Sequence, residues 1–282
     1  FTYDAFVIAL LMLGIALFVT EYLSEEKIQT KRTMVSILAM VVGCFSKAVY
    51  IPFLALYWLM PKDKFYSRRQ KNLFKAGIFV LLILMFASFI LPLIGNVTSG
   101  AEVGDYRGGD TSQTSQLSMI LGYPLTYTGV LLKSLGTTFA SYFIGSKVLA
   151  NFAYRGIYDG IGYFVVLLTM LFTFVTDFGM TEKTYDAQMK RKILMMKIWN
   201  AVLIFGTACL VWTALYLDFT PVGSMVINGV SPRYYLPLIF PLSFIFINQK
   251  VRCSMKLENY QSLIAFLMLI GTGISIYCLM LA

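Results

Sequence analysis

The chain has 282 residues, of which 58% are hydrophobic and 13% are charged, and its formal net charge is +9. Soluble domains use about 45–50% apolar and about 25% charged residues, so this composition excludes a soluble protein and indicates an all-α membrane protein with several spans. The basic residues gather in short loops between apolar runs, as the positive-inside rule describes, so the charge does not indicate nucleic-acid binding. The chain has no histidine, which removes the commonest acid–base and metal-binding side chain near neutral pH.

Apolar runs close to the spanning length of about 17–25 residues occur near residues 5–23, 76–95, 163–178, 196–217, 232–248 and 261–281. The chain begins at Phe1 rather than Met and enters the first run at once, without a signal-peptide pattern. We therefore expect residues 1–282 to be a single transmembrane domain that forms the C-terminal part of a longer chain.

The apolar stretch 34–60 contains one charged residue, Lys47. As one straight helix its roughly 27 residues would be about 40 Å long, which exceeds a hydrocarbon core of about 30 Å. Two short helices meeting near Lys47 would return the chain to its starting side and place the basic loops 24–33 and 61–75 together in the cytoplasm. The positive-inside rule favours this hairpin, with residues 96–162 and 218–231 outside.

The outer segment 96–162 divides into two parts. Residues 96–115 are rich in Gly, Ser, Thr and Asp, which is typical of an irregular solvated loop. Residues 124–143 carry apolar side chains near helical spacing between polar ones, with Pro124 at the start. This pattern predicts an amphipathic helix that lies at the outer membrane interface.

Lys47 is the first candidate site residue, because a lone ammonium at membrane depth costs roughly 2.5–3.5 kcal/mol and normally faces a partner, water or a bound anion. Two interpretations are open. Lys47 is a ligand for an anion, or it is a structural cation that pairs within the bundle or extends to the membrane interface. Tyr50, one turn later, can share either role. Arg233 follows a loop with Gly229 and Pro232. Its guanidinium suits a phosphate, and the alternative is an interfacial arginine beside Tyr234 and Tyr235.

Carboxylates are the candidates for acid–base chemistry. Asp105 and Asp110 bracket a Gly-rich turn that is either a metal or substrate loop or an ordinary solvated loop. Asp4, at the entrance of the first span, is suited to capping a helix. A general base would be one of the outer carboxylates or would precede Phe1. The other outer carboxylates are Glu102, Asp159 and Asp218.

Four segments carry a resemblance: Asp4 before an apolar span, residues 46–52 around Lys47, Gln116-Leu117 with Pro124, and residues 229–237 around Arg233. Together they resemble the bacterial membrane family named domain of unknown function 2142, although the family usually has Gln-Gly where this chain has Ser231-Pro232. That family is similar to the GT-C membrane glycosyltransferases, which take sugars from polyprenyl-phosphate carriers. A lysine that contacts the lipid phosphate is a theme of that superfamily, and the context of Lys47 resembles it. We expect Lys47, Arg233, Tyr50 and Tyr234 to bind the lipid phosphate.

We expect Asp105, Asp110 and Gln116 to belong to an acceptor or substrate loop, and the resemblance implies that the catalytic carboxylate precedes Phe1. We thus expect a GT-C-like helical bundle in the inner membrane of a bacterium. It would transfer a sugar from a polyprenyl-phosphate donor to a cell-envelope glycan, with membrane lipids, the carrier and the glycan acceptor as partners. Whether a divalent metal is a further cofactor is left open by the sequence. The alternatives are a lipid-linked glycan transporter or flippase, and a non-catalytic subunit of an envelope-glycan assembly.

Overall fold

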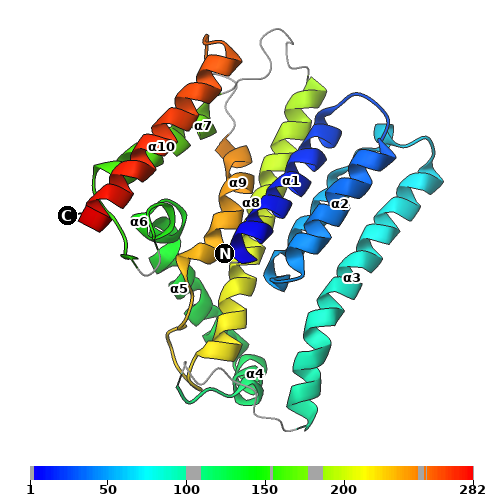
Figure 1. Cartoon of the computed structure of the whole chain (residues 1–282). Coiled ribbons are helices and arrows are strands. Elements are labelled where there is room, and N and C mark those ends of the chain that lie inside the picture. Colours follow the sequence, from blue (N-terminus) through cyan, green and yellow to red (C-terminus); the bar gives the residue numbers. More distant parts are fainter. Residues whose placement is uncertain are drawn as a thin grey trace.

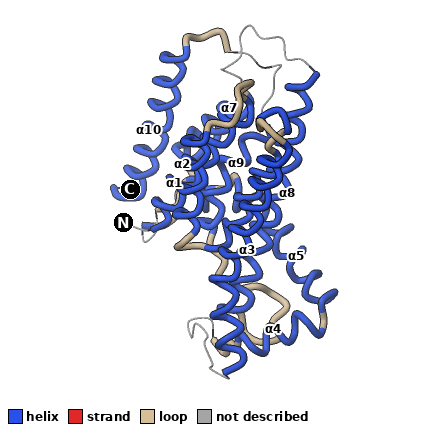
Figure 2. The backbone as a smooth tube through the Cα atoms, turned by 90° about the vertical axis from the view of Figure 1, so that its right-hand side faces the viewer, coloured by secondary structure: helices blue, strands red, loops and turns tan. Residues whose placement is uncertain are grey.

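The computed structural model describes residues 3–99, 109–152, 155–176, 187–246, 251 and 253–281. These ranges are mainly helical and contain no β-strand, which confirms the all-α prediction (Figures 1 and 2). The elements, in chain order, are α1 (Tyr3–Leu23), α2 (Thr30–Cys44), η1 (Ala48–Leu59), η2 (Lys62–Lys64), α3 (Arg68–Ser99), α4 (Gln113–Gly122), α5 (Pro124–Phe143), α6 (Ser146–Leu149), α7 (Ile161–Val175), α8 (Ala187–Phe219), η5 (Pro232–Tyr235), α9 (Leu236–Phe246) and α10 (Leu257–Leu281).

Four of the described helices are long and apolar enough to cross a membrane, namely α1, α3, α8 and α10. Large apolar side chains such as Leu84 on α3 and Leu269 on α10 are more than half exposed, as expected of surfaces that lipid covers. The predicted span 232–248 differs, because its described part is the short 3-10 helix η5 followed by the 11-residue α9. The molecule is a multi-pass membrane protein in which long helices are combined with short ones.

The predicted break near Lys47 is confirmed, because α2 ends at Cys44 and η1 begins at Ala48. The two halves are antiparallel. Near their middle the Tyr57 hydroxyl donates to Ser36 Oγ (2.5 Å), and beyond their far ends the Ile28 amide donates to the Lys64 carbonyl (2.9 Å). The hairpin therefore brings both basic loops to the same end, although its second half is a 3-10 helix rather than an α-helix.

Small residues bring α1 close to this hairpin. A Cβ added at Gly14 would overlap the Met40 side chain, and Ser36 Oγ donates to the Gly14 carbonyl (2.5 Å). Close backbone approach at small residues is a usual basis of helix packing in membranes. Lipid tails are as apolar as the side chains, so the hydrophobic effect does not drive helices together there. Figure 1 shows α1 (blue) beside α2, with the N-terminal end of α1 near the C-terminal end of α2.

The outer segment contains the predicted helix with its predicted bounds, α5 at Pro124–Phe143. Its depth at the membrane surface stays a prediction. The described ends of the segment 96–115 differ from an irregular loop, because α3 continues to Ser99 and α4 begins at Gln113, while residues 100–108 lie outside the described part of the chain. The reason at α4 is local: Ser112 caps the helix, its Oγ accepting from the Ser115 amide (3.4 Å). Figure 2 shows α4 and α5 at one end of the molecule.

Candidate anion site at the hairpin turn

Lys47 forms a buried ion pair with Asp4. Each residue is only 9% exposed, and the two belong to different elements, the start of α1 and the turn between α2 and η1. Asp4 is thus a partner of Lys47. The sequence alone suggested helix capping for Asp4 and did not identify the residue that pairs with Lys47. A buried pair of this kind is strongly perturbed by removal of either member, because the remaining charge is then buried without compensation.

The ring of Tyr234 brings the second cation to the same place. Lys47 Nζ lies 4.2 Å from the centroid of that ring, and Arg233 Cζ lies 5.7 Å from it. The two cationic centres are therefore no more than about 10 Å apart, the sum of these distances. Residues 47 and 233 thus meet at one aromatic side chain.

A hydrogen bond from a side chain of the hairpin to the backbone of η5 holds the two elements together. The hydroxyl of Tyr50, a fully buried residue, donates to the Tyr234 carbonyl (2.7 Å). The loop before η5 turns at Gly229, where φ is +79° and a Cβ would overlap Phe219, so glycine is required there. Pro232 then starts the 3-10 helix. Tyr50 therefore positions Tyr234, and through it Arg233, next to Lys47.

Arg233 is the exposed member of the group. Within the part of the chain that the structure describes, its guanidinium has no hydrogen bond or ion pair, and it lies over the Tyr234 ring. Asp4, Lys47 and Arg233 together carry a charge of +1, since the carboxylate offsets one of the two cations. This arrangement can accept one further negative charge at the Arg233 side.

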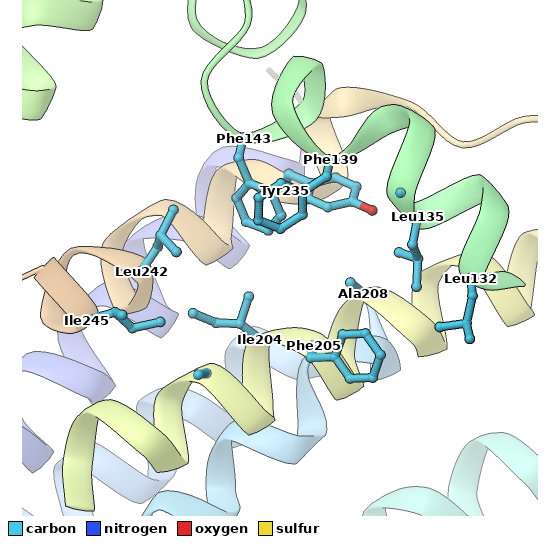
Figure 3. Close-up of a pocket in the computed structure, with 12 residues that line it drawn as sticks. Leu132, Leu135, Phe139, Phe143, Ile204, Phe205, Ala208, Tyr235, Leu242 and Ile245 are labelled. Atoms are coloured by element: carbon cyan, nitrogen blue, oxygen red, sulfur yellow. The ribbon is translucent and has the colours of Figure 1, made fainter. Parts of the chain in front are cut away.

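An apolar cavity of about 400 Å³ lies on the other side of η5. Figure 3 shows Tyr235 at its upper wall with Phe139 and Phe143 of α5, while Ile204 and Phe205 of α8 form the opposite wall. Tyr234 and Tyr235 are consecutive in a 3-10 helix, so they point in different directions. The first faces the cations and the second faces the cavity. The remaining lining residues are Leu132, Leu135, Gly136, Ala201, Ala208, Leu242 and Ile245.

The residues predicted for an acceptor loop do not join this site. Gln116 is fully buried, and its Nε2 donates to the carbonyls of Tyr216 (3.3 Å), Thr220 (2.9 Å) and Pro221 (3.1 Å). It therefore fastens α4 to the end of α8, where helix carbonyls have no intrahelical partner. Asp110 is exposed, and its carbonyl accepts from the Val222 amide (3.3 Å). Asp105 lies outside the described residues, and an acceptor role for all three stays a prediction.

No group of three or more Cys, Asp or Glu side chains that could hold a metal ion is found among the described residues. The Asp4 carboxylate is engaged by Lys47. The arrangement is therefore suited to binding an anion beside an apolar chain.

Comparison with known proteins agrees with the sequence resemblance at the level of the family. No curated protein and no solved structure matches this chain. The family model described as "predicted membrane protein (DUF2142)" matches residues 1–242, which include Asp4, the hairpin and all of η5. The chain therefore belongs to this family of predicted membrane proteins, domain of unknown function 2142.

Proposed function

We propose that this protein is a polyprenyl-phosphate-dependent glycosyltransferase that acts at the outer face of a bacterial inner membrane in cell-envelope glycan synthesis. The observation that supports the proposal is the convergence of Lys47 and Arg233 on the Tyr234 ring, next to an apolar cavity. A polyprenyl phosphate has the same two parts, an anion joined to an apolar chain.

The charge of the group favours a phosphate over a neutral ligand. Arg233 presents an exposed guanidinium, and guanidinium groups bind phosphate oxygens through paired hydrogen bonds. Lys47 lies within about 10 Å on the same ring, but Asp4 offsets its charge, so the net positive charge of the group is supplied by Arg233. A phosphate held by Arg233 would compete with the Asp4 carboxylate for Lys47.

The cavity behind Tyr235 would hold part of the isoprenoid chain. Its volume of about 400 Å³ is within the range of 300–1,000 Å³ that is usual for ligand sites. Its walls are almost entirely aliphatic and aromatic. They suit a hydrocarbon chain, which has no polar group that would need a hydrogen-bond partner. The chain would then pass along η5 from the phosphate to the cavity.

A transporter or flippase for a lipid-linked glycan, or a non-catalytic subunit, would use the same anion site, so the test must detect covalent transfer. Membrane vesicles that contain the full chain would be incubated with a panel of radiolabelled undecaprenyl-phosphate sugars and envelope glycan acceptors. We expect the label to reach an acceptor with the wild-type protein and to be reduced at least about tenfold by Arg233→Gln, since a hydrogen bond to a charged group contributes about 1.5–3 kcal/mol.

The matched control is Arg155→Gln, which removes an exposed arginine from the segment predicted to lie outside. It should leave transfer unchanged. Movement of the labelled lipid across the membrane without covalent transfer would identify a transporter instead. An equal loss in both arginine variants would exclude a specific role for Arg233.

A further inference from the structure

A second cavity lies at the opposite end of α1 from the anion site. It has a volume of about 320 Å³ and lies between the far end of the hairpin, at Trp58, and the N-terminal turns of α8, at Arg191 and Lys192. Tyr22 also lines this cavity. It lies about 27 Å along the α1 axis from Asp4, at a rise of about 1.5 Å per residue. This distance is close to the thickness of a hydrocarbon core, so the two sites belong to opposite membrane surfaces.

The walls of this cavity are fixed by contacts between the elements. The Tyr22 hydroxyl donates to the Lys192 carbonyl (3.1 Å), and the rings of Trp58 and Trp199 lie 6.4 Å apart. Lys192 Nζ lies 3.6 Å from Asp63 Oδ2, and the Lys192 side chain is only 12% exposed. Figure 1 shows the C-terminal end of α1 and the N-terminal end of α8 at the same end of the molecule.

Arg191 is the cation that this framework leaves available. It is exposed, and among the described residues its side chain has no hydrogen bond or ion pair. Gln188, one turn earlier on α8, lines the same cavity with an amide that can also donate. Two cations therefore face the cavity, and only one of them has a carboxylate partner.

The aromatic and basic residues place this cavity at headgroup level. Trp and Tyr gather where the hydrocarbon core meets the headgroups, and basic residues gather on the cytoplasmic side. The α8 helix has 33 residues and is about 50 Å long, so it extends beyond the hydrocarbon core. Its basic first turns are then beside the phosphates of the cytoplasmic leaflet, where anionic lipids attract polybasic segments.

We propose that this cavity binds the phosphate headgroup of an anionic glycerophospholipid from the cytoplasmic leaflet. The Arg191 guanidinium would hold two phosphate oxygens, Lys192 would add a second positive charge, and Trp58 would contact the glycerol end of the acyl chains. The bound lipid would join the hairpin to α8, because its partners come from both. This site is independent of the proposed glycosyltransferase function.

The test uses the full-length protein purified in mild detergent and exposed to equal amounts of phosphatidylglycerol and phosphatidylcholine, with bound lipid measured by native mass spectrometry. We expect one phosphatidylglycerol to be retained in preference to phosphatidylcholine. Arg191→Gln should weaken its retention at least about tenfold, as expected for the loss of a charge-assisted contact. The matched control is Lys190→Gln, which makes the same change of charge at an exposed neighbour that does not line the cavity.

Three results would overturn the proposal. Equal weakening by Arg191→Gln and Lys190→Gln would show only diffuse attraction to a basic surface. Equal retention of both lipids would show that the headgroup charge is not recognised. Thermal stabilisation by inorganic phosphate in phosphatidylcholine nanodiscs that matches the stabilisation by phosphatidylglycerol would assign the site to a soluble phosphate compound rather than to a lipid.

Discussion

The Asp4–Lys47 ion pair allows a quantitative prediction about stability. Lys47→Met would leave the Asp4 carboxylate 9% exposed and without its cation, and breaking a buried pair in this way costs about 3–5 kcal/mol of unfolding free energy. Asp4→Asn should cost less, about 2–3 kcal/mol, because the ammonium keeps its place 4.2 Å from the Tyr234 ring, a contact that contributes about 0.5–2 kcal/mol. The double variant has neither charge, so its cost should fall below the sum of the two single costs by at least about 2 kcal/mol.

The assay is the free energy of unfolding of the purified protein in mixed micelles, measured by denaturant titration for the wild type, both single variants and the double variant. Lys62→Met is the matched control, since Lys62 is exposed at the start of η2, and we expect it to change stability by less than about 0.5 kcal/mol. Additivity of the two single variants within about 0.5 kcal/mol would refute the buried pair.

Three further predictions concern the fold. Gln116→Ala should lower the unfolding free energy by about 1–3 kcal/mol, because its amide donates to three carbonyls at the end of α8; a change below about 0.5 kcal/mol in denaturant titration would contradict this role. Gly162→Ala should reduce cysteine cross-linking between α7 and α10, because a Cβ at this position would overlap the backbone of α10. The control Gly273→Ala should leave the cross-linking unchanged, because a Cβ there meets open space. Equal effects of the two substitutions would contradict close packing at Gly162. Single cysteines at Ser24 and Ser67, on a background without the native cysteines, should react with an impermeant thiol reagent from the same side of the membrane, and opposite accessibility would exclude the hairpin.

The hairpin and α5 were predictable from sequence because each follows from a one-dimensional constraint. The hairpin follows from a stretch too long for one crossing with basic loops on both flanks, and α5 follows from helical spacing after Pro124. The type of helix was not predictable within 34–60, since the uniformly apolar η1 has no periodicity that separates a 3-10 from an α-helix. Likewise, the polar composition of 96–115 favours a loop, but the start of α4 depends on the Ser112 cap.

The candidate site was predictable only in part. An isolated cation in an apolar stretch marked Lys47, and a constrained turn before an apolar run marked Arg233. Their meeting at Tyr234 depends on tertiary packing across 186 positions of sequence, which no local pattern encodes. The pairing of Asp4 with Lys47 has the same origin. One signal was present, however, because Asp4 and Lys47 are opposite charges at the edges of two neighbouring apolar segments.

The central claim is that Arg233 and Lys47 recognise the phosphate of a polyprenyl carrier. Its most direct test compares the binding of undecaprenyl phosphate with that of undecaprenol, which lacks the phosphate, to the purified protein in neutral-lipid nanodiscs. We predict that the wild type prefers the phosphate by about 10-fold to 150-fold and that Arg233→Gln removes most of this preference, as expected for a contact of about 1.5–3 kcal/mol. Equal affinity of the wild type for both lipids, or an unchanged preference in Arg233→Gln, would contradict the account.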